Sequence, residues 1–266
     1  MKSIVRMENV SQTLTQAGKG PGGEHATLRD ITLDIHEGEC VGLVGAPGCG
    51  KSALLSLVAG HTRPAAGRVL CKERKVAGPG PDRALVFRNH ALLPWLTCFD
   101  NVYLAVERVF GGREGKPGLK RRTHEALARF GLSEAETWFP HEISIGMKQR
   151  VGLARALAMQ PAVLLLDDPF ATLDAAMRAS LQDELMAILG ETGITLVLAT
   201  SDADEAVLLS DRVVMLSRGR ASAEGTLDVN FPRPRDRIAL ADDAGFVAIR
   251  QVVRAFLARA CSRQAA

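Results

Sequence analysis

Short apolar runs separated by helix-like stretches recur over most of this chain, and this alternation is its main structural signal. Uninterrupted apolar runs predict buried strands at Cys40–Val44, Val163–Asp167 and residues 194–200. Apolar residues at helical spacing predict helices at residues 53–59, 147–159 and 175–189. Strands that alternate with helices in this way are typical of a parallel sheet covered by helices. The pattern therefore predicts an α/β fold.

Two further segments extend this core. Residues 4–43 contain alternating runs, such as residues 26–35, and predict an antiparallel β region. Residues 92–140 have mostly helical spacing, and together with the helix that ends near residue 158 they predict a helical subdomain inserted over about residues 92–158.

The C-terminal part of the chain has its own pattern. Residues 212–217 and 220–223 flank Gly219 and predict a terminal hairpin, and residues 245–260 predict an amphipathic helix. We expect residues 1–230 to form one domain and residues 231–266 to form a tail. The tail helix either packs on the domain or contacts a partner, and the first reading is favoured.

A glycine-rich segment, GAPGCGKS, lies between the first apolar run and the helix-like stretch that follows it. This is the place of a phosphate-binding loop, whose glycines let backbone N–H groups converge on phosphate oxygens. Lys51 would reach the β- and γ-phosphates, and the Ser52 hydroxyl would take one Mg²⁺ position. The chain is therefore expected to bind a nucleoside triphosphate. The predicted nucleotide-binding residues are Gly45, Ala46, Pro47, Gly48, Cys49, Gly50, Lys51, Ser52 and Ala53.

A second match to such a site comes at the end of a later apolar run. Residues 162–166 lead into Asp167 and Asp168. A buried parallel strand delivers such carboxylates to the sheet edge where ligands bind. Asp167 is expected to hold Mg²⁺, directly or through water.

Composition narrows the possible classes of protein. The 266 residues are 47% hydrophobic and 24% charged, and the net charge of +3 comes from mixed acidic and basic residues, which gives no argument for nucleic-acid binding. The five cysteines form no C-x-x-C pair, so neither a disulfide framework nor a zinc site is indicated and a reducing cytosol is expected. No signal pattern and no membrane-spanning apolar stretch appears, so another chain would have to cross a membrane.

The segment SIGMKQR at residues 144–150, upstream of LLLDDPF, resembles the signature of ABC transporter ATP-binding subunits, LSGGMKQR. The resemblance covers nearly the whole chain and includes Asp174 and the segment 200–206. GPGPDRALVFRNHALLPWLTCFDNVYLAV and the later FPRPRDR are similar to a narrower group, the importers of nitrate, sulfonates, taurine and similar small anions, with nitrate-type subunits the most alike.

The resemblance implies a P-loop ATPase fold with an antiparallel β subdomain and an inserted helical subdomain, and ATP and Mg²⁺ as cofactors. It implies a head-to-tail dimer in which each ATP lies between one phosphate loop and the partner's signature. It also implies a transmembrane permease received near residues 92–97, a solute-binding protein in the same system, and a peripheral place on the cytoplasmic face of the plasma or inner membrane. The implied partner-site residues are Ser144, Ile145, Gly146, Met147 and Gln149, and Asp174 belongs to the D-loop.

Several positions depart from the family pattern. Arg88 stands where the family has a glutamine that touches Mg²⁺ and the attacking water, and Asp168 replaces the glutamate that acts as general base. Ser201 replaces the histidine that hydrogen-bonds the γ-phosphate, and Ile145 replaces the first signature glycine. The first aromatic residue is Phe87, so the usual aromatic residue for stacking the base ahead of the phosphate loop is missing.

These substitutions affect the water, the metal, the γ-phosphate and the dimer contact, so slow or absent hydrolysis is expected. Arg88 would offset γ-phosphate charge and favour a long-lived ATP-bound state. Three readings stay open: an energy-coupling ATPase subunit of an anion importer with weak turnover, a non-hydrolytic regulator or scaffold paired with a competent ATPase, and a soluble ABC ATPase acting on nucleic acid or ribosomes. An ATPase of the last kind would normally show a long coiled coil or two tandem nucleotide domains, and this sequence shows neither.

Overall fold

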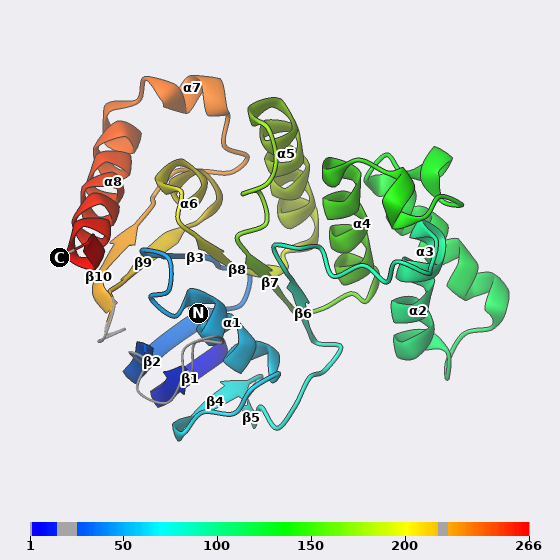
Figure 1. Cartoon of the computed structure of the whole chain (residues 1–266), viewed down its shortest axis with the longest axis horizontal. Helices are drawn as coiled ribbons and strands as arrows, with labels where there is room; N and C mark the ends of the chain where they lie inside the picture. Colours follow the sequence, from blue (N-terminus) through cyan, green and yellow to red (C-terminus); the bar gives the residue numbers. More distant parts are fainter. Residues whose placement is uncertain (1, 15–25, 218–222, 266) are drawn as a thin grey trace. The chain divides into compact units, whose positions relative to one another are not determined.

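The computed structural model describes residues 2–14, 26–217 and 223–265 (Figure 1). The chain forms two compact units. The first combines Met1–Pro79 with Leu189–Ala266, and the second is Gly80–Ile188. The hairpin turn expected at Gly219 lies outside the described residues.

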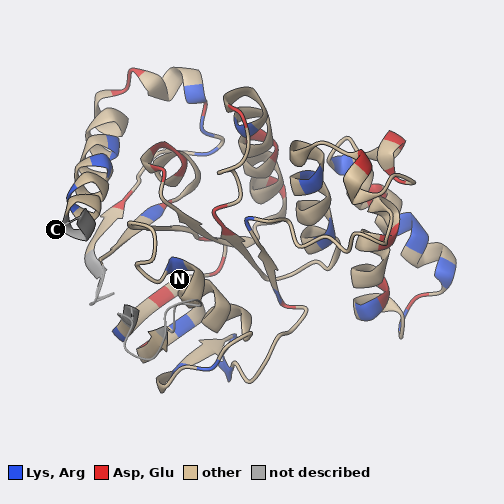
Figure 2. Cartoon of the chain, in the orientation of Figure 1, with Lys and Arg blue, Asp and Glu red and all other residues tan. Residues whose placement is uncertain are grey.

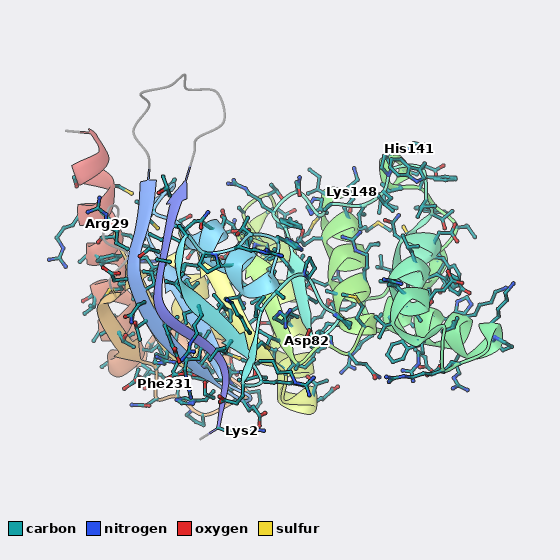
Figure 3. The ribbon with its side chains drawn as sticks, turned by 90° about the horizontal axis from the view of Figure 1, so that it is seen from below. Lys2, Arg29, Asp82, His141, Lys148 and Phe231 are labelled. Atoms are coloured by element: carbon teal, nitrogen blue, oxygen red, sulfur yellow. The ribbon has the colours of Figure 1, made fainter. Side chains whose placement is uncertain are left out.

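An antiparallel sheet makes up one part of the first unit. Its strands β1 (Ser3–Leu14), β2 (Ala26–His36), β4 (Ala66–Cys71) and β5 (Arg74–Lys75) follow the order β2-β1-β4-β5, and the long β1 and β2 run side by side in Figure 3. The antiparallel pairing expected near the N-terminus is therefore confirmed for β1 and β2. The sequence pattern did not predict strands β4 and β5, because β4 is exposed over its first three residues and β5 is only two residues long.

Parallel strands form the other part of this unit. The fully buried β3 (Cys40–Val44) pairs in parallel with β8 (Thr195–Thr200) and with β9 (Arg212–Leu216), and β10 (Ala223–Asp228) pairs antiparallel with β9. The antiparallel pair expected here is therefore confirmed, but its second strand is Ala223–Asp228 and not residues 220–223. Helix α1 (Lys51–Ala59) follows β3, and α6 (Ala203–Leu209) follows β8. Apolar side chains of β3 and β8 are buried on both faces, as in a covered parallel sheet.

The C-terminal tail packs on the first unit. Helices α7 (Arg237–Ala241) and α8 (Ala244–Ala265) follow β10, and α8 packs on α6 (Figure 1). Phe246 meets Phe231 edge to face at 5.6 Å, and Arg254 of α8 contacts Asp204 of α6 at 2.6 Å. The amphipathic helix expected here is therefore confirmed. Of its two expected roles, the structure shows packing against the rest of this chain.

The second unit contains a strand pair and a group of helices. Strands β6 (Arg83–Val86) and β7 (Val163–Asp167) pair in parallel. Helices α2 (Cys98–Phe110), α3 (Lys116–Arg129) and α4 (Ile145–Ala158) pack against one another (Figure 1), and α5 (Ala175–Thr192) begins in this unit. Two short 3-10 turns, η1 (Ser133–Ala135) and η2 (Pro140–Glu142), link α3 to α4.

Charge is dispersed over both units. In Figure 2, blue and red segments are spread over both units, and the charged segments of α4 and α8 are blue. Many of these charges are paired within the fold, for example Arg122 with Glu114 at 2.6 Å. Among the described helices, none is long and apolar enough to span a bilayer.

Candidate functional site

The phosphate loop lies between β3 and α1 in the first unit, as the sequence predicts. Gly48 and Gly50 adopt positive φ angles of 78° and 106°, where a side chain would be strained. A Cβ on Gly45 would stand 2.4 Å from the Leu216 carbonyl oxygen and 2.5 Å from Cys49 Sγ. The loop therefore needs glycine at these positions to keep its backbone turned toward a ligand.

Helix α1 begins in a way that suits an anion. Its N-cap is Gly50, which supplies no side-chain cap to the first turn. The first N–H groups of a helix have no partner within the helix and carry a partial positive charge. The start of α1 thus fits a phosphate group, as in other nucleotide sites.

Lys51 is folded back onto the loop. Its Nζ donates to the carbonyl oxygens of Gly45, at 2.5 Å, and Ala46, at 3.3 Å. The ammonium group is therefore held at the loop by neutral acceptors, which it can exchange for the stronger acceptor oxygens of a phosphate.

Ser201 belongs to the same unit and the same sheet edge as the phosphate loop. Val44 and Thr200 are register partners in β3 and β8, so Gly45 and Ser201 each follow a paired residue at the C-terminal ends of adjacent parallel strands. Ser201 is exposed, and the next residue, Asp202, caps α6 by accepting from Asp204 N at 2.7 Å. The structure therefore brings Ser201 and the phosphate loop to one edge of the sheet.

Arg88, Asp167 and Asp168 lie together in the second unit. Val86 and Leu166 are register partners in β6 and β7. Asp167 is the last residue of β7, and Arg88 and Asp168 follow the two strands, so all three residues lie at the C-terminal end of this pair. Arg88 Nη1 lies 3.4 Å from Asp168 Oδ2. Arg88 and Asp168, two of the residues that depart from the family pattern, are therefore in contact with each other.

The loop after Arg88 is fastened to helix α4. His90 Nδ1 and Gln149 Oε1 form a buried hydrogen bond, and Arg155 donates to the carbonyl oxygens of Ala91, at 2.8 Å, and His90, at 3.1 Å. Burial lowers the pKa of Arg155 from its ordinary value. Sequence reasoning missed His90 and Arg155, because their partners lie about 60 residues away and leave no local pattern.

The signature residues lie around the start of α4. Ser144 is the N-cap and accepts from Met147 N at 3.2 Å, and Lys148, which Figure 3 labels, belongs to the first turn. Ile145 is 51% exposed, whereas Gly146 is buried beneath Met177, whose Sδ would stand 2.7 Å from an added Cβ.

Asp174 and Gln149, two other residues expected at the partner contact, differ in their exposure. Asp174 is exposed and caps the start of α5, because its Oδ1 accepts from Met177 N at 2.8 Å. Gln149 is fully buried and bonded to His90, so its side chain cannot touch a partner chain in this conformation. The role expected for Gln149 at a partner site stays a prediction, and it would require this side chain to leave its buried position.

The segment 92–97 has a defined shape that Asn101 of α2 maintains. The Asn101 Oδ1 accepts from Leu93 N at 2.8 Å, and its Nδ2 donates to the carbonyl oxygens of Leu93, Leu96 and Thr97 at 2.9–3.1 Å. Trp95 projects from this loop with 69% of its surface exposed. A rigid loop that presents a large aromatic side chain is typical of a protein contact.

The candidate site residues therefore form two sets. The phosphate loop and Ser201 belong to the first unit, and Arg88, Asp167, Asp168 and the signature residues belong to the second. The glycine cradle and the uncapped start of α1 fit a phosphate group. The Ser52 hydroxyl of the first unit and the Asp167 carboxylate of the second are each oxygen groups of the kind that Mg²⁺ prefers. Among the described residues, no cluster of three His, Cys, Asp or Glu side chains forms a metal site by itself.

Comparison with known proteins decides the family. The model of the family described as "ABC transporter" matches residues 28–171 of this chain. The chain is 52% identical over 258 residues to the Nitrate transport protein NasD of Klebsiella oxytoca, covering 97% of each chain. This chain belongs to the ABC transporter family. It is an ABC-type ATPase with the P-loop fold, and it binds ATP.

Other relatives agree with this assignment. The Nitrate import ATP-binding protein NrtC of Synechococcus elongatus is 45% identical over 97% of this chain, and the Bicarbonate transport ATP-binding protein CmpC of Synechocystis is 42% identical over 97%. This chain spans only 38% of the length of each of these two proteins. Among solved structures, the ATP-binding cassette MJ0796, a dimer in a post-hydrolysis state with ADP and Pi, matches 86% of this chain and all of its own chain with a TM-score of 0.76 and 28% identity.

Proposed function

We propose that this ABC ATPase is the ATP-binding subunit of an importer for a small anion, with nitrate the first candidate. The observation that carries the proposal is the 52% identity to the Nitrate transport protein NasD over 97% of both chains. The names of NrtC and CmpC point to nitrate and bicarbonate, so the solute class is a small oxyanion. Sulfonate- or taurine-like solutes stay candidates because the anion is selected by other subunits.

Each site residue has a role in this proposal. The residues Gly45 to Ala53 and Lys51 within them bind the phosphates, and Ser52 and Asp167 hold Mg²⁺, which supplies charge neutralisation at the phosphates. Arg88, Asp168 and Ser201 stand at the positions where hydrolysis is carried out. Ser144, Ile145, Gly146 and Met147 face the partner's nucleotide, with Asp174 beside them.

The assembly is proposed on the same basis. A second ATP-binding subunit would complete each nucleotide site, and the similar MJ0796 cassette is a dimer. A transmembrane permease would dock on the loop of residues 92–97 that presents Trp95. A solute-binding protein serves the same system. The chain would then work at the cytoplasmic face of the plasma or inner membrane, and nucleic acid has no part in it. Residues 1–230 would act as the cassette and residues 231–266 as its packed tail.

Weak turnover is a further part of the proposal. Four substitutions, Arg88, Ile145, Asp168 and Ser201, fall on the groups that would position water and stabilise the γ-phosphate. A displacement of about 1 Å in such a site costs on the order of a hundredfold in rate. The alternative is a non-hydrolytic nucleotide-binding regulator paired with a competent ATPase, which the same substitutions favour.

Steady-state ATP hydrolysis over a range of protein concentrations tests the proposed weak turnover. The native chain is compared with a variant that carries Arg88→Gln, Ile145→Gly, Asp168→Glu and Ser201→His, with Lys51→Ala as the inactive control. We expect only the repaired variant to turn over, at a rate per chain that rises with concentration as dimers form. Comparable hydrolysis by the native chain would show that the substitutions do not impair it.

The solute is tested in cells. Nitrate uptake is measured in Klebsiella oxytoca that lacks NasD, with this chain or its Lys51→Ala variant supplied in its place. Uptake that returns with the native chain and not with the variant supports a nucleotide-dependent role in nitrate import. Uptake that returns equally with Lys51→Ala would show that the restored uptake does not depend on nucleotide binding at this loop, against both the proposal and its alternative. Uptake that returns with neither argues against nitrate as the solute.

A further inference from the structure

We infer that Met177 is a site of reversible oxidation by peroxides, and that its sulfoxide loosens the signature turn, residues 144–147, at the start of α4. Helices α4 and α5 carry the groups involved and lie side by side (Figure 1), with both the signature turn and Met177 inside the second unit. The oxidation and the loosening do not depend on the proposed function. Only their effect on ATP hydrolysis, which the last experiment measures, rests on it.

Met177 differs from the other methionines that the structure describes, because it is open to solvent. It is 44% exposed, whereas Met7 and Met215 are 1% and 8% exposed. The remaining described methionines are half-buried, namely Met147, Met159 and Met186. A dissolved oxidant attacks accessible sulfur first. Among the described methionines, Met177 is therefore the one that a peroxide reaches most easily.

The sulfur of this exposed side chain packs directly on the signature turn. A Cβ added to Gly146 would stand 2.7 Å from Met177 Sδ, 3.8 Å from Met177 Cγ and 3.9 Å from Ser144 Oγ. Gly146 is buried although it is only the second residue of α4. Because the nearest atoms to its missing side chain belong to Met177, the thioether is the group that covers it.

The space around the sulfur is mainly apolar. A cavity of about 180 Å³ lies between the start of α4 and the segment that leads into α5. Arg150 borders this cavity, but its guanidinium donates to the Phe130 carbonyl oxygen at 3.0 Å and pairs with Glu184 at 2.7 Å. A thioether suits such a place, whereas a polar sulfoxide is better solvated by water. The apolar side chains that line the cavity are Met147, Leu173, Met177 and Leu181.

The backbone of Met177 is anchored separately from its side chain. Asp174 Oδ1 accepts from Met177 N at 2.8 Å and so holds the first turn of α5. The unbranched side chain of methionine is flexible and changes its conformation easily. Oxidation therefore moves the side chain off Gly146 while α5 keeps its cap.

The chemistry is a two-electron oxygen transfer. The thioether sulfur attacks one oxygen of hydrogen peroxide, an S–O bond forms, the O–O bond breaks, and the other oxygen leaves as water after a proton transfer. The sulfoxide is polar and chiral, and methionine sulfoxide reductases A and B each return one epimer to the thioether. Two thiols supply the electrons for that return and become a disulfide, and the sulfoxide oxygen leaves as water.

Hydrogen peroxide treatment of the full chain tests the site and its effect. All samples carry Cys261→Ser, so that the exposed thiol does not react with the peroxide. Peptide mass spectrometry gives the oxidation rate of each methionine, and hydrogen exchange follows the amides of residues 147–150. Two of these amides report on the signature turn, because Met147 N donates to Ser144 Oγ at 3.2 Å and Lys148 N to the Ser144 carbonyl oxygen at 3.0 Å.

Three variants accompany the parent. Met177→Leu keeps an apolar side chain of similar volume that cannot be oxidised, and Met177→Gln supplies a polar group of similar length without any oxidant. The matched control is Met186→Leu, which makes the same change at a half-buried methionine of α5.

We expect Met177 to be oxidised about tenfold faster or more than Met7 and Met215, because these two are buried. Exchange of residues 147–150 should then speed up by about fivefold or more, as local opening of the uncovered turn becomes easier. Met177→Leu should remove this response to peroxide, Met177→Gln should reproduce it without peroxide, and Met186→Leu should leave it intact. Reduction by the two sulfoxide reductases should restore slow exchange.

Four results would overturn the inference. They are oxidation of Met177 no faster than that of Met7 and Met215, exchange that is unchanged once Met177 is oxidised, a peroxide response that persists in Met177→Leu, and exchange in Met177→Gln equal to that of the untreated parent.

ATP hydrolysis separates this inference from the proposed function. The rate is measured before and after peroxide treatment in the variant that carries Arg88→Gln, Ile145→Gly, Asp168→Glu and Ser201→His. If the signature turn serves a partner's nucleotide, oxidation should lower the rate by about tenfold or more, since misplaced groups in such a site cost rate on this scale. Unchanged hydrolysis together with faster exchange would contradict the proposed role of the signature and not the oxidation site. Unchanged exchange in the oxidised chain would refute the inference whatever the rate of hydrolysis.

Discussion

At the scale of single residues, Gly45 is a position in the phosphate loop that leaves no room for a side chain. Replacing Gly45 with alanine would place a methyl group 2.4 Å from the Leu216 carbonyl oxygen, so the backbone must move. We expect a loss of about 1–3 kcal/mol of unfolding free energy, since overpacking a close contact costs that much. We also expect ATP binding to weaken at least tenfold, or about 1.4 kcal/mol, because the loop loses its shape.

Thermal unfolding and equilibrium ATP binding measure these two effects. Gly190→Ala is the control, because Gly190 lies in α5 with no atom within 4 Å of an added Cβ. Alanine replaces glycine there at no steric cost and should stabilise the helix by about 0.5–1 kcal/mol. If Gly45→Ala binds ATP as the native chain does, the close approach seen at this loop is not required.

Thiol reactivity also follows from single-residue environments. Cys40, Cys49, Cys71 and Cys98 are buried, and Cys261 is exposed on α8. Burial raises the pKa of Cys40 to about 11, so this thiol stays protonated and unreactive at pH 8. We expect a maleimide to label one cysteine rapidly in the folded chain and Cys261→Ser to abolish that phase. Rapid labelling of a second site would show that a buried thiol becomes accessible.

Among the elements, the C-terminal tail is fastened by an unusual arginine. The Arg235 side chain is 1% exposed and donates to the carbonyl oxygens of Ser210, Leu208 and Val229 at 2.6–3.0 Å. Burial lowers its pKa from the ordinary value, yet the guanidinium satisfies the carbonyls that end α6. The FPRPRDR segment thus has a structural role in this chain.

Arg235→Met should destabilise the protein by about 2–4 kcal/mol, because several buried carbonyl groups lose their donor. Urea unfolding measures the change. Arg259→Met on the exposed side of α8 is the control and should change the unfolding free energy by less than about 0.5 kcal/mol. A small effect of Arg235→Met would mean that water replaces the guanidinium at these carbonyls.

The Trp95 loop is a second element whose shape depends on one side chain. Asn101→Asp keeps the acceptor for Leu93 N but loses the amide donor to three carbonyl oxygens. Hydrogen exchange of residues 92–97 should therefore speed up by about tenfold or more, as a net loss of about 1.5 kcal/mol implies. Unchanged exchange in this segment would show that packing, and not Asn101, holds the loop.

Some strands and helices could be predicted from the sequence, whereas others could not. β3 and β7 match their predicted bounds, because each is a continuous apolar run buried on both faces. α6 and α7 were missed, since helices of seven and five residues show too little periodicity. The Arg88–Asp168 and His90–Gln149 contacts were missed for another reason. They depend on register and tertiary packing between distant segments, which no local spacing records.

At the scale of the whole molecule, one chain carries substitutions on both sides of the proposed dimer contact. Under the proposed function, Arg88, Asp168 and Ser201 would serve the chain's own nucleotide, whereas Ile145 would serve the nucleotide of a partner. In a dimer with a second subunit that has glutamine, glutamate, histidine and glycine at these positions, neither of the two sites is complete. Such a dimer should hydrolyse ATP at well under half the rate of the competent homodimer.

Repairing one side at a time separates the two contributions. Ile145→Gly completes only the site on the partner's phosphate loop, and Arg88→Gln with Asp168→Glu and Ser201→His completes only the other. Each repaired heterodimer should therefore approach about half of the homodimer rate if the sites fire independently, and the two gains should add, as expected for sites without shared partners. Purified heterodimers and a coupled phosphate-release assay give these rates. If Ile145→Gly brings no gain while the other repair does, the exposed isoleucine is tolerated at the contact, and the chain's weakness lies in its own nucleotide site alone.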